Sequence, residues 1–301
     1  MPQTLLQTKP DWLKINPPKT EKFSEVKQTI KQLGLHTVCV EAHCPNITEC
    51  WDSGTATFMV LGDTCTRGCR FCAVKTAGKG NEVDVFEPRK LAVAIQKFGL
   101  GYVVVTSVDR DDLFDQGAGH FADCIREIKK LSPGTLVEVL IPDFRGNEDC
   151  IKKIVEARPD VIAHNIETVK SLQSIVRDRR ANYSQSLLVL EKVKEMDKKI
   201  FTKSSIMLGL GEQEEQVFQA MDDLRGINVD FLTLGQYLRP SLKHIALSEF
   251  VAPEKFDYYK NIALQKGFLY CASGPFVRSS YKAGEFFVKS LVENRGKQLA
   301  N

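Results

Sequence analysis

The chain carries nine cysteines among its 301 residues, and six of them fall in one short stretch that runs from Cys39 to Cys72. Three of the six form the pattern C-x3-C-x2-C, at Cys65, Cys69 and Cys72. Thiols that crowd together on one loop in a reducing compartment are more often metal ligands or catalytic groups than disulfides. The first chemistry to expect is therefore metal or iron–sulfur binding on this loop.

Three thiolates on one loop can hold three irons of a [4Fe–4S] cluster and leave the fourth iron without a protein ligand. An iron with an open position can bind a substrate, as an open position does in catalytic metal sites generally. The alternative is a structural zinc loop, but zinc needs a fourth ligand and this spacing is not a typical zinc pair. We therefore expect Cys65, Cys69 and Cys72 to be both cluster ligands and catalytic residues.

A second set of cysteines precedes the first. Cys39, Cys44 and Cys50 have the spacing C-x4-C-x5-C, and two triplets within 34 residues are hard to explain by core packing. We expect this set to hold a second metal centre. The remaining cysteines are scattered, and a free cysteine often behaves as a small hydrophobic residue, so a core position is expected for them. They are Cys124, Cys150 and Cys271.

The elements that position these loops alternate between short apolar runs and segments of helical period, as βα units with a parallel sheet do. The expected strands lie at residues 56–62, 102–108, 136–142, 161–167, 201–209 and 231–238. The expected helices lie near residues 23–33, 88–98, 118–131, 147–157, 186–196, 212–225 and 253–266. Six consecutive βα units favour a partial (β/α)6 TIM-like barrel over an open sheet.

The expected α/β barrel covers residues 55–267. Residues 1–54 form an N-terminal extension that carries the second cysteine set, and residues 268–301 form a C-terminal extension that closes the barrel mouth. In such barrels the chemistry lies at the carboxyl ends of the strands. The loop 63–72 directly follows the first expected strand, so its cysteines stand where the fold places an active site.

The C-x3-C-x2-C spacing, with an aromatic residue before the third cysteine, resembles the radical S-adenosylmethionine superfamily. The upstream triplet makes the resemblance more specific, because such a set closely followed by this loop is similar to the lipoyl synthase family. The R-S-S-Y motif of that family is present as Arg278-Ser279-Ser280-Tyr281. Further stretches, among them residues 106–112, 164–168 and 203–212, extend the resemblance over nearly the whole chain.

The resemblance implies a radical sulfurtransferase with two [4Fe–4S] clusters and S-adenosyl-L-methionine as cofactors. The cluster at Cys65, Cys69 and Cys72 would generate a 5′-deoxyadenosyl radical that abstracts hydrogen at C6 and then at C8 of an octanoyl chain. The first triplet and Ser280 would hold an auxiliary cluster that is consumed as the sulfur donor, with Ser279 as the alternative ligand. Without the resemblance, the two serines are interpreted as a turn or a helix N-cap.

Polar side chains end two of the expected strands. Thr106 and Ser107 end the second strand, and Asn165 and Glu167 end the fourth, so both pairs face the expected barrel mouth. Hydroxyl and carboxylate groups there can bind the ribose hydroxyls and the methionyl ammonium of S-adenosyl-L-methionine. We expect these four residues and Leu208 to contact the cofactor, and the alternative is a set of helix caps and salt bridges.

The net charge of the chain and its lack of apparent targeting signals limit the partners and the compartment that we expect. The 41 basic and 38 acidic residues leave a net charge of +3, which is too small to favour a nucleic-acid partner. Arg177, Arg179 and Arg180 form a basic cluster, interpreted either as a solvated face or as a site for an acidic carrier domain or the substrate chain. No signal peptide and no apolar run of about 18 residues is apparent, so we expect a cytoplasmic enzyme that does not bind a membrane.

The resemblance also implies protein partners. The substrate would be an octanoyl-lysine on a lipoyl carrier domain, as in 2-oxoacid dehydrogenase E2 subunits and the glycine cleavage H protein. Ferredoxin or flavodoxin would supply electrons, and iron–sulfur cluster assembly proteins would rebuild the auxiliary cluster. The competing functions are a methylthiotransferase acting on RNA, a ferredoxin-like electron carrier and a zinc-stabilised binding protein. A methylthiotransferase would need a basic RNA-binding domain, which the small net charge does not favour. A ferredoxin-like carrier gains nothing from an open iron. A zinc-stabilised protein would contain zinc and no sulfide, so metal and sulfide analysis distinguishes it.

Overall fold

The computed structural model describes residues 9–14 and 17–280, and residues 1–8, 15–16 and 281–301 lie outside the described part. Its centre is an eight-stranded sheet with the order β1-β2-β5-β6-β7-β8-β9-β10. These strands are β1 His36–Thr37, β2 Thr57–Val60, β5 Tyr102–Ser107, β6 Leu136–Leu140, β7 Val161–Ala163, β8 Phe201–Leu208, β9 Phe231–Gln236 and β10 Tyr270–Gly274. All neighbours are parallel except β1, which runs antiparallel to β2.

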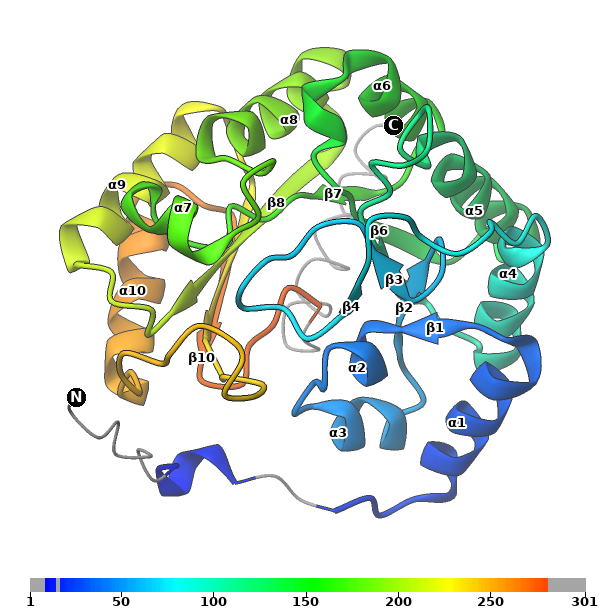
Figure 1. The fold of residues 1–301 in the computed structure, drawn as a ribbon, viewed down its shortest axis with the longest axis horizontal. Helices are drawn as coiled ribbons and strands as arrows, with labels where there is room; N and C mark the ends of the chain where they lie inside the picture. The colour runs from blue at the N-terminus through cyan, green and yellow to red at the C-terminus, as the bar shows by residue number, and fades with distance from the viewer. Residues whose placement is uncertain (1–8, 15–16, 281–301) are drawn as a thin grey trace, which may run out of the picture.

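Helices form a ring outside the sheet, and each parallel strand from β2 to β9 leads into at least one of them (Figure 1). The α-helices are α1 Glu21–Leu33, α2 Val38–Glu41, α3 Ile47–Asp52, α4 Glu87–Phe98, α5 Ala118–Leu131, α6 Glu148–Glu156, α7 Gln173–Val176, α8 Tyr183–Met196, α9 Glu214–Gly226 and α10 Pro253–Gln265. Three short 3-10 helices lie at Asp11–Leu13, Phe144–Gly146 and Lys170–Leu172. A separate two-stranded sheet, β3 Thr64–Cys65 with β4 Lys75–Thr76, brackets the cysteine loop.

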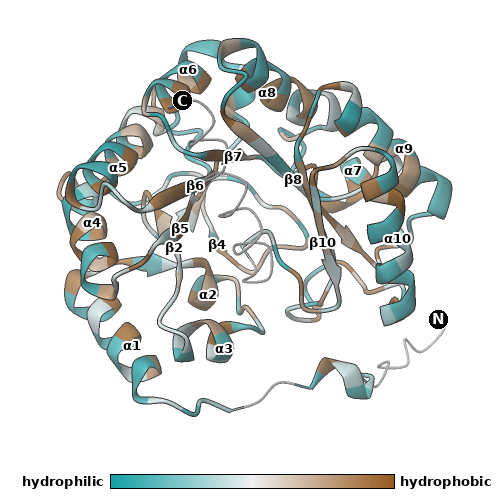
Figure 2. Cartoon of the chain, turned by 180° about the vertical axis from the view of Figure 1, so that it is seen from behind, coloured by the Kyte–Doolittle hydropathy of each residue, from teal (hydrophilic) through white to brown (hydrophobic). Residues whose placement is uncertain are grey.

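The apolar pattern of the sequence explains these layers. The strands are buried on both faces, because the ring of helices covers one face and the barrel interior the other, as in β5 from Val103 to Val105. In α5, Phe121, Ile125 and Ile128 recur at helical spacing and are fully buried. Figure 2 shows the same division, with hydrophobic colour on the strands and hydrophilic colour on the outer surfaces of the helices.

The predicted partial (β/α)6 barrel is confirmed. Six of the parallel strands coincide with the six predicted ones, and α5 begins and ends at the predicted residues. In the described part of the chain β1 and β10 are the two edges of the sheet, so the barrel is open between them. No helix in that part is long and apolar enough to cross a membrane.

Two features were not predicted. The sheet continues past residue 267, because β10 pairs with β9 in the register Tyr270↔Phe231 and so begins the expected C-terminal extension. The expected N-terminal extension before residue 55 contributes, besides the predicted helix, β1 and the short helices α2 and α3. Both differences concern elements of two to six residues, which carry too little periodicity for a sequence pattern to show.

Candidate active site

The loop with the C-x3-C-x2-C motif begins at a strained residue after β2. Leu61 has a φ of 68°, a left-handed conformation that a branched side chain rarely adopts. Its N–H donates to Glu87 Oε2 at 2.9 Å, and its carbonyl accepts from Arg110 Nη1 at 3.2 Å. His120 Nε2 lies 2.6 Å from the same Glu87 oxygen, and Gly117 lies so close that a Cβ there would be 2.4 Å from Leu61 Cδ1. These contacts fix the direction in which the chain leaves the sheet.

Arg67 ties the same loop to the ends of two neighbouring strands. Its side chain is buried, and its Nη1 and Nη2 each donate to an oxygen of Asp143 at 2.7 Å. Its Nε and Nη2 donate to the two oxygens of Asp111 at 2.9 and 3.0 Å. Breaking a buried, bidentate pair of this kind leaves an uncompensated charge in the interior. The backbone of the loop is therefore held firmly on the carboxyl ends of β5 and β6.

The three motif thiols lie half-buried on this loop. Burial raises the pKa of Cys65, Cys69 and Cys72 to about 12 each. Two backbone N–H groups point at the sulfurs, from Arg67 to Cys65 at 3.4 Å and from Asp178 to Cys69 at 3.3 Å. A thiol with such a pKa remains protonated at neutral pH unless a bound metal displaces the proton. The two N–H groups would stabilise the sulfurs as thiolates once a metal centre displaces the protons.

The motif cysteines do not form a compact single-ion site among the described residues. Within residues 9–14 and 17–280, one group of three potential ligands comes within 4.8 Å of one another: Glu87, His120 and Cys124. It includes none of the six motif cysteines. A Zn–S distance of about 2.3 Å brings the sulfurs of a zinc site within about 4 Å of one another. The described residues thus show no compact three-cysteine zinc site, and the C-x3-C-x2-C spacing is what indicates an iron–sulfur cluster.

Two polar atoms at the barrel mouth lack partners. Ser107 Oγ and Asn165 Oδ1 are buried and make no hydrogen bond within the described part of the chain. Asn165 Nδ2 donates to Glu167 Oε1 at 3.1 Å, and burial raises the pKa of the Glu167 carboxyl, which interacts electrostatically with Cys72. Unsatisfied buried polar atoms are rare in folded proteins. Their position beside the cysteine loop therefore fits a polar ligand at this mouth.

The fold already uses the side chains of the other two predicted cofactor residues. Thr106 Oγ1 donates to the carbonyl of Leu140 at 3.0 Å. The Leu208 side chain is fully buried in the core cluster with Val217 of α9, and its carbonyl accepts from Tyr237 N at 2.7 Å. The Thr106 hydroxyl proton and the Leu208 side chain are therefore already engaged within the fold.

The three arginines after β7 do not form one surface, and the interpretation as a solvated face is wrong for Arg177. Arg177 is buried and donates to Gln173 Oε1 at 3.1 Å and to Ser186 Oγ at 2.8 Å. No carboxylate of the described residues lies within 4.0 Å of its nitrogens. Arg180 is half-buried and paired with acidic side chains, and Arg179 is exposed.

The second cysteine set lies on and between two short helices beside β2. Cys39 belongs to α2, Cys50 belongs to α3, and the backbone N–H of Cys44 donates to the Cys39 carbonyl at 3.1 Å. Burial raises the pKa of Cys39 to about 11 and also raises that of Cys44. Cys39, Cys50 and Cys65 share one hydrophobic cluster, so both cysteine sets border the same core.

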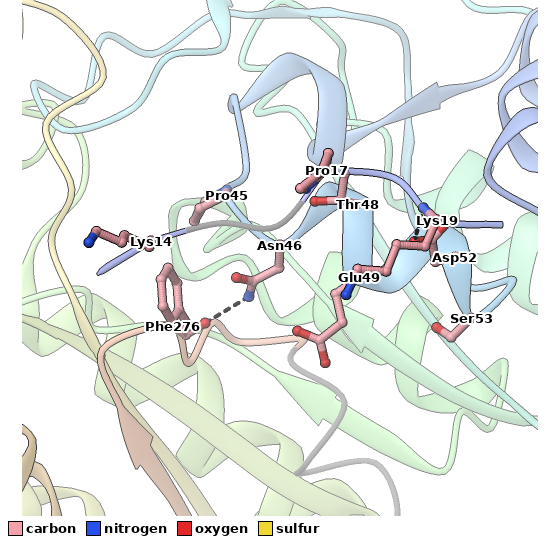
Figure 3. Close-up of a pocket in the computed structure, with 10 residues that line it drawn as sticks. All are labelled: Lys14, Pro17, Lys19, Pro45, Asn46, Thr48, Glu49, Asp52, Ser53 and Phe276. Carbon is pink, nitrogen blue, oxygen red and sulfur yellow. Dashed lines mark hydrogen bonds between the residues drawn. The ribbon is translucent and has the colours of Figure 1, made fainter. Parts of the chain in front are cut away.

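The segment that follows β10 returns to this second set. Asn46 Nδ2 donates to the carbonyl of Phe276 at 2.7 Å (Figure 3). Ser280 Oγ accepts a hydrogen bond from Thr57 Oγ1 at 2.8 Å, and the backbone of Thr57 lies close enough to the Cys39 sulfur to lower the pKa of that thiol. Thr57 therefore contacts both a cysteine of the set and the serine.

The close approach of this segment depends on a glycine, since a Cβ at Gly235 would lie 2.1 Å from the Val277 carbonyl oxygen. Ser280 is the serine of the R-S-S-Y motif that has a hydrogen bond in the described part, and Tyr281 lies outside that part.

A pocket of about 390 Å³ lies on the outer side of α3, between the N-terminal segment and the segment after β10 (Figure 3). Lys14, Lys19, Glu49 and Asp52 contribute charges of both signs to its wall, and none of its lining residues is a cysteine. Asp52 accepts from the backbone N–H of Lys19 at 2.8 Å, which holds the N-terminal segment in place. The pocket is thus a junction of three segments that borders the second cysteine set.

Comparison with known proteins agrees with the fold and the cysteine loop. Residues 59–224 match the family model of the radical SAM superfamily. The crystal structure of the FeFe-hydrogenase maturase HydG from Carboxydothermus hydrogenoformans superposes with a TM-score of 0.54 at 12% identity, covering 89% of this chain and 78% of that one. The barrel and its three-cysteine loop thus define a protein of the radical SAM class.

A second match is more specific. Residues 3–44 match the N-terminal domain of lipoyl synthase. The chain is 56% identical to "Lipoyl synthase" of Anaeromyxobacter dehalogenans over 96% of its length and 98% of that protein. It is also 56% identical to "Lipoyl synthase, apicoplast" of Plasmodium vivax, over 96% of this chain but 65% of that protein. The chain belongs to the lipoyl synthase family, as its cysteine motifs predict.

Membership of this family implies S-adenosyl-L-methionine and [4Fe–4S] clusters as cofactors. The described residues fit these groups, since each cysteine triplet can supply three free thiols as ligands and two buried polar atoms at the mouth lack a hydrogen-bond partner. The scattered cysteines are buried in the core, as predicted: Cys124, Cys150 and Cys271.

Some residues of the site were missed at the level of sequence. Arg67 stands within the motif loop, but its partner Asp143 is 76 residues away and no local pattern connects them. Thr57 lies 223 residues before Ser280, with no signal beyond its place at the start of a strand. Arg177 stands beside Arg179 and Arg180, so the sequence pattern groups it with a basic cluster and gives no sign of its burial.

Proposed function

We propose that this chain inserts two sulfur atoms, at C6 and C8, into an octanoyl group carried on a lysine of a lipoyl carrier domain. When bound, its cofactors supply the radical that removes hydrogen from an unactivated carbon and the sulfide that replaces it. The observation that carries the proposal is the convergence on one barrel of two cluster-spaced cysteine sets, one of them beside Ser280. An electron carrier gains nothing from an open iron or from unpartnered polar atoms beside it.

The two cysteine sets take different tasks in this proposal. Cys65, Cys69 and Cys72 hold the catalytic cluster and leave one iron open for S-adenosyl-L-methionine. The auxiliary cluster, which is the sacrificial sulfur donor, is held by Cys39, Cys44, Cys50 and Ser280. Ser280 is preferred over Ser279 because its oxygen bonds to Thr57, the residue that also contacts Cys39.

The residues around the mouth bind and orient the cofactor. Ser107 Oγ and Asn165 Oδ1 are the unpartnered groups that would bind its polar atoms, with Glu167 beside them. Thr106 and Leu208 would contribute backbone contacts. Arg177 adds a buried positive charge that interacts electrostatically with Glu167 but makes no direct ion pair among the described residues, so it would bind the carboxylate of the methionyl group. Together these groups hold the reacting atoms in line and exclude water.

The partners follow from the substrate. We propose lipoyl carrier domains of 2-oxoacid dehydrogenase E2 subunits and the glycine cleavage H protein as substrates, ferredoxin or flavodoxin as the electron donor, and assembly proteins that rebuild the auxiliary cluster. The cytoplasm is the proposed compartment. The support is the bacterial relative, whose name carries no organelle, and the absence of a membrane-spanning helix from the described part.

The test is anaerobic turnover of the chain reconstituted with ³⁴S-sulfide, given reductant, S-adenosyl-L-methionine and an octanoylated lysine peptide. We expect a peptide product that has gained two ³⁴S atoms. Ser280→Ala should abolish this product and Ser279→Ala should retain it. Failure of the wild-type protein to add sulfur with both clusters present would overturn the proposed function, and equal activity of the two serine variants would overturn the ligand assignment.

A further inference from the structure

The contacts of Thr57 are unusual because this one residue touches two groups that come from opposite ends of the chain. Thr57 is the first residue of β2 and is buried. Its hydroxyl donates to Ser280 Oγ at 2.8 Å, across 223 residues of sequence, and its backbone lies close enough to the Cys39 sulfur to lower the pKa of that thiol. The strand to which it belongs is locked in the sheet, with Thr57 opposite Val104 of β5.

The other contact that holds the C-terminal segment here does not involve a proposed ligand. Asn46 is bonded to the backbone of Phe276, four residues before Ser280, and so fixes the path of the chain rather than the serine side chain. A serine hydroxyl rotates freely about its Cα–Cβ bond unless a partner holds it. Among the described residues the partner of the Ser280 hydroxyl is Thr57. The direction of the serine oxygen therefore depends on this hydroxyl.

We propose that Thr57 is the positioning residue of the auxiliary site, which sets the serine oxygen and the Cys39 sulfur at a fixed separation on one iron–sulfur cluster. This inference rests on the proposed role of Ser280 as a ligand. Strand β2 holds Thr57 in a fixed position. The backbone of Thr57 orients the Cys39 sulfur, and its hydroxyl orients the Ser280 oxygen. Outer partners of this kind orient metal ligands, and their loss typically weakens metal binding about 10- to 100-fold.

The hydrogen bond from Thr57 also explains how serine, a weak ligand for iron, can serve in the auxiliary site. Oxygen is a poor partner for iron beside three thiolates, so a freely rotating serine would spend much of its time away from the metal. Thr57 removes that rotational freedom before iron binds, which lowers the entropic cost of the bond. The serine can then hold one iron of an intact cluster and release it when the cluster is dismantled.

The test measures iron release instead of turnover. Holoprotein with both clusters is mixed anaerobically with a chelator, and the release of iron is followed in the wild type and in Thr57→Val, Thr57→Ser, Ser280→Ala and the double variant Thr57→Val/Ser280→Ala. Thr57→Val keeps the shape of the side chain but removes the hydroxyl, whereas Thr57→Ser keeps the hydroxyl. Cluster content before mixing and thermal unfolding are measured for each, so that a folding defect is recognised.

We expect Thr57→Val to release about one extra iron per chain, the iron left without a protein ligand, at a rate at least about 10-fold above the wild type. Ser280→Ala should do the same, Thr57→Ser should resemble the wild type, and the double variant should be no faster than Ser280→Ala alone. Thr57→Val behaving as the wild type while Ser280→Ala releases iron would overturn the inference and leave the ligand assignment intact. An additive double variant would also overturn it, since Thr57 would then act without the serine. No effect of Ser280→Ala would overturn the ligand assignment itself.

Discussion

The two cysteine sets of this molecule are held in opposite ways. The loop with Cys65 is fixed by buried ion pairs and by the clamp on Leu61, most of them made to residues that directly follow the central barrel strands β5 and β6. The set with Cys39 is assembled from both ends of the chain by a few hydrogen bonds, such as those from Asn46 and Thr57. A catalytic centre that is used repeatedly benefits from a rigid support. A centre that is consumed and rebuilt needs a support that can open.

The largest effect should follow removal of the buried cation under the catalytic loop. Arg67→Met leaves Asp111 and Asp143 buried without their main partner, so we expect the free energy of unfolding to fall by about 3–5 kcal/mol. Anaerobic urea unfolding of the holoprotein measures this loss. The matched control is Arg145→Met, because Arg145 also pairs with Asp111 but is half exposed, and it should cost less than about 1 kcal/mol. Equal losses in both variants would contradict a rigid, buried support for this loop.

A smaller effect should follow crowding of the clamp on Leu61. In Gly117→Ala the new Cβ would meet Leu61 Cδ1 at 2.4 Å, and Gly117 has a φ of 83°. We expect a cost of about 1–3 kcal/mol from overpacking in addition to about 1 kcal/mol of backbone strain. Gly99→Ala is the control, since Gly99 has a φ of 61° but no atom within 4 Å of a Cβ, so it should show the strain alone. Thermal unfolding that ranks the two variants equally would show that Leu61 moves aside and that the clamp is soft.

The sequence predicts the parts of the molecule that repeat or that lie close together in the chain. The six barrel strands and α5 follow from apolar runs and helical spacing, and the two cysteine sets follow from spacing alone. The contacts that hold the two cysteine sets join residues that are far apart in the sequence. Examples are Arg67 with Asp143 and Thr57 with Ser280. Such contacts depend on the register of packed strands and on the path of the segment after β10, neither of which leaves a local pattern.

Two residues that the sequence predicts to lie on a surface or at the barrel mouth are buried in the structure. Arg177 stands beside two other arginines in the sequence, yet it is buried while Arg179 is exposed. Leu208 ends a strand at the mouth, but its side chain belongs to the core against α9. The end of a strand indicates which residues lie near the mouth, whereas the pleat decides which side chains face it.

The most direct test of the account separates radical formation from sulfur insertion in two variants. Cys69→Ala and Cys44→Ala are reconstituted anaerobically and given reductant, S-adenosyl-L-methionine and an octanoylated lysine peptide, and both 5′-deoxyadenosine and the peptide mass are measured. The account predicts that Cys69→Ala forms neither product, whereas Cys44→Ala still forms 5′-deoxyadenosine but adds no sulfur. Sulfur insertion by Cys44→Ala, or 5′-deoxyadenosine formation by Cys69→Ala, would contradict the division of tasks between the two sets.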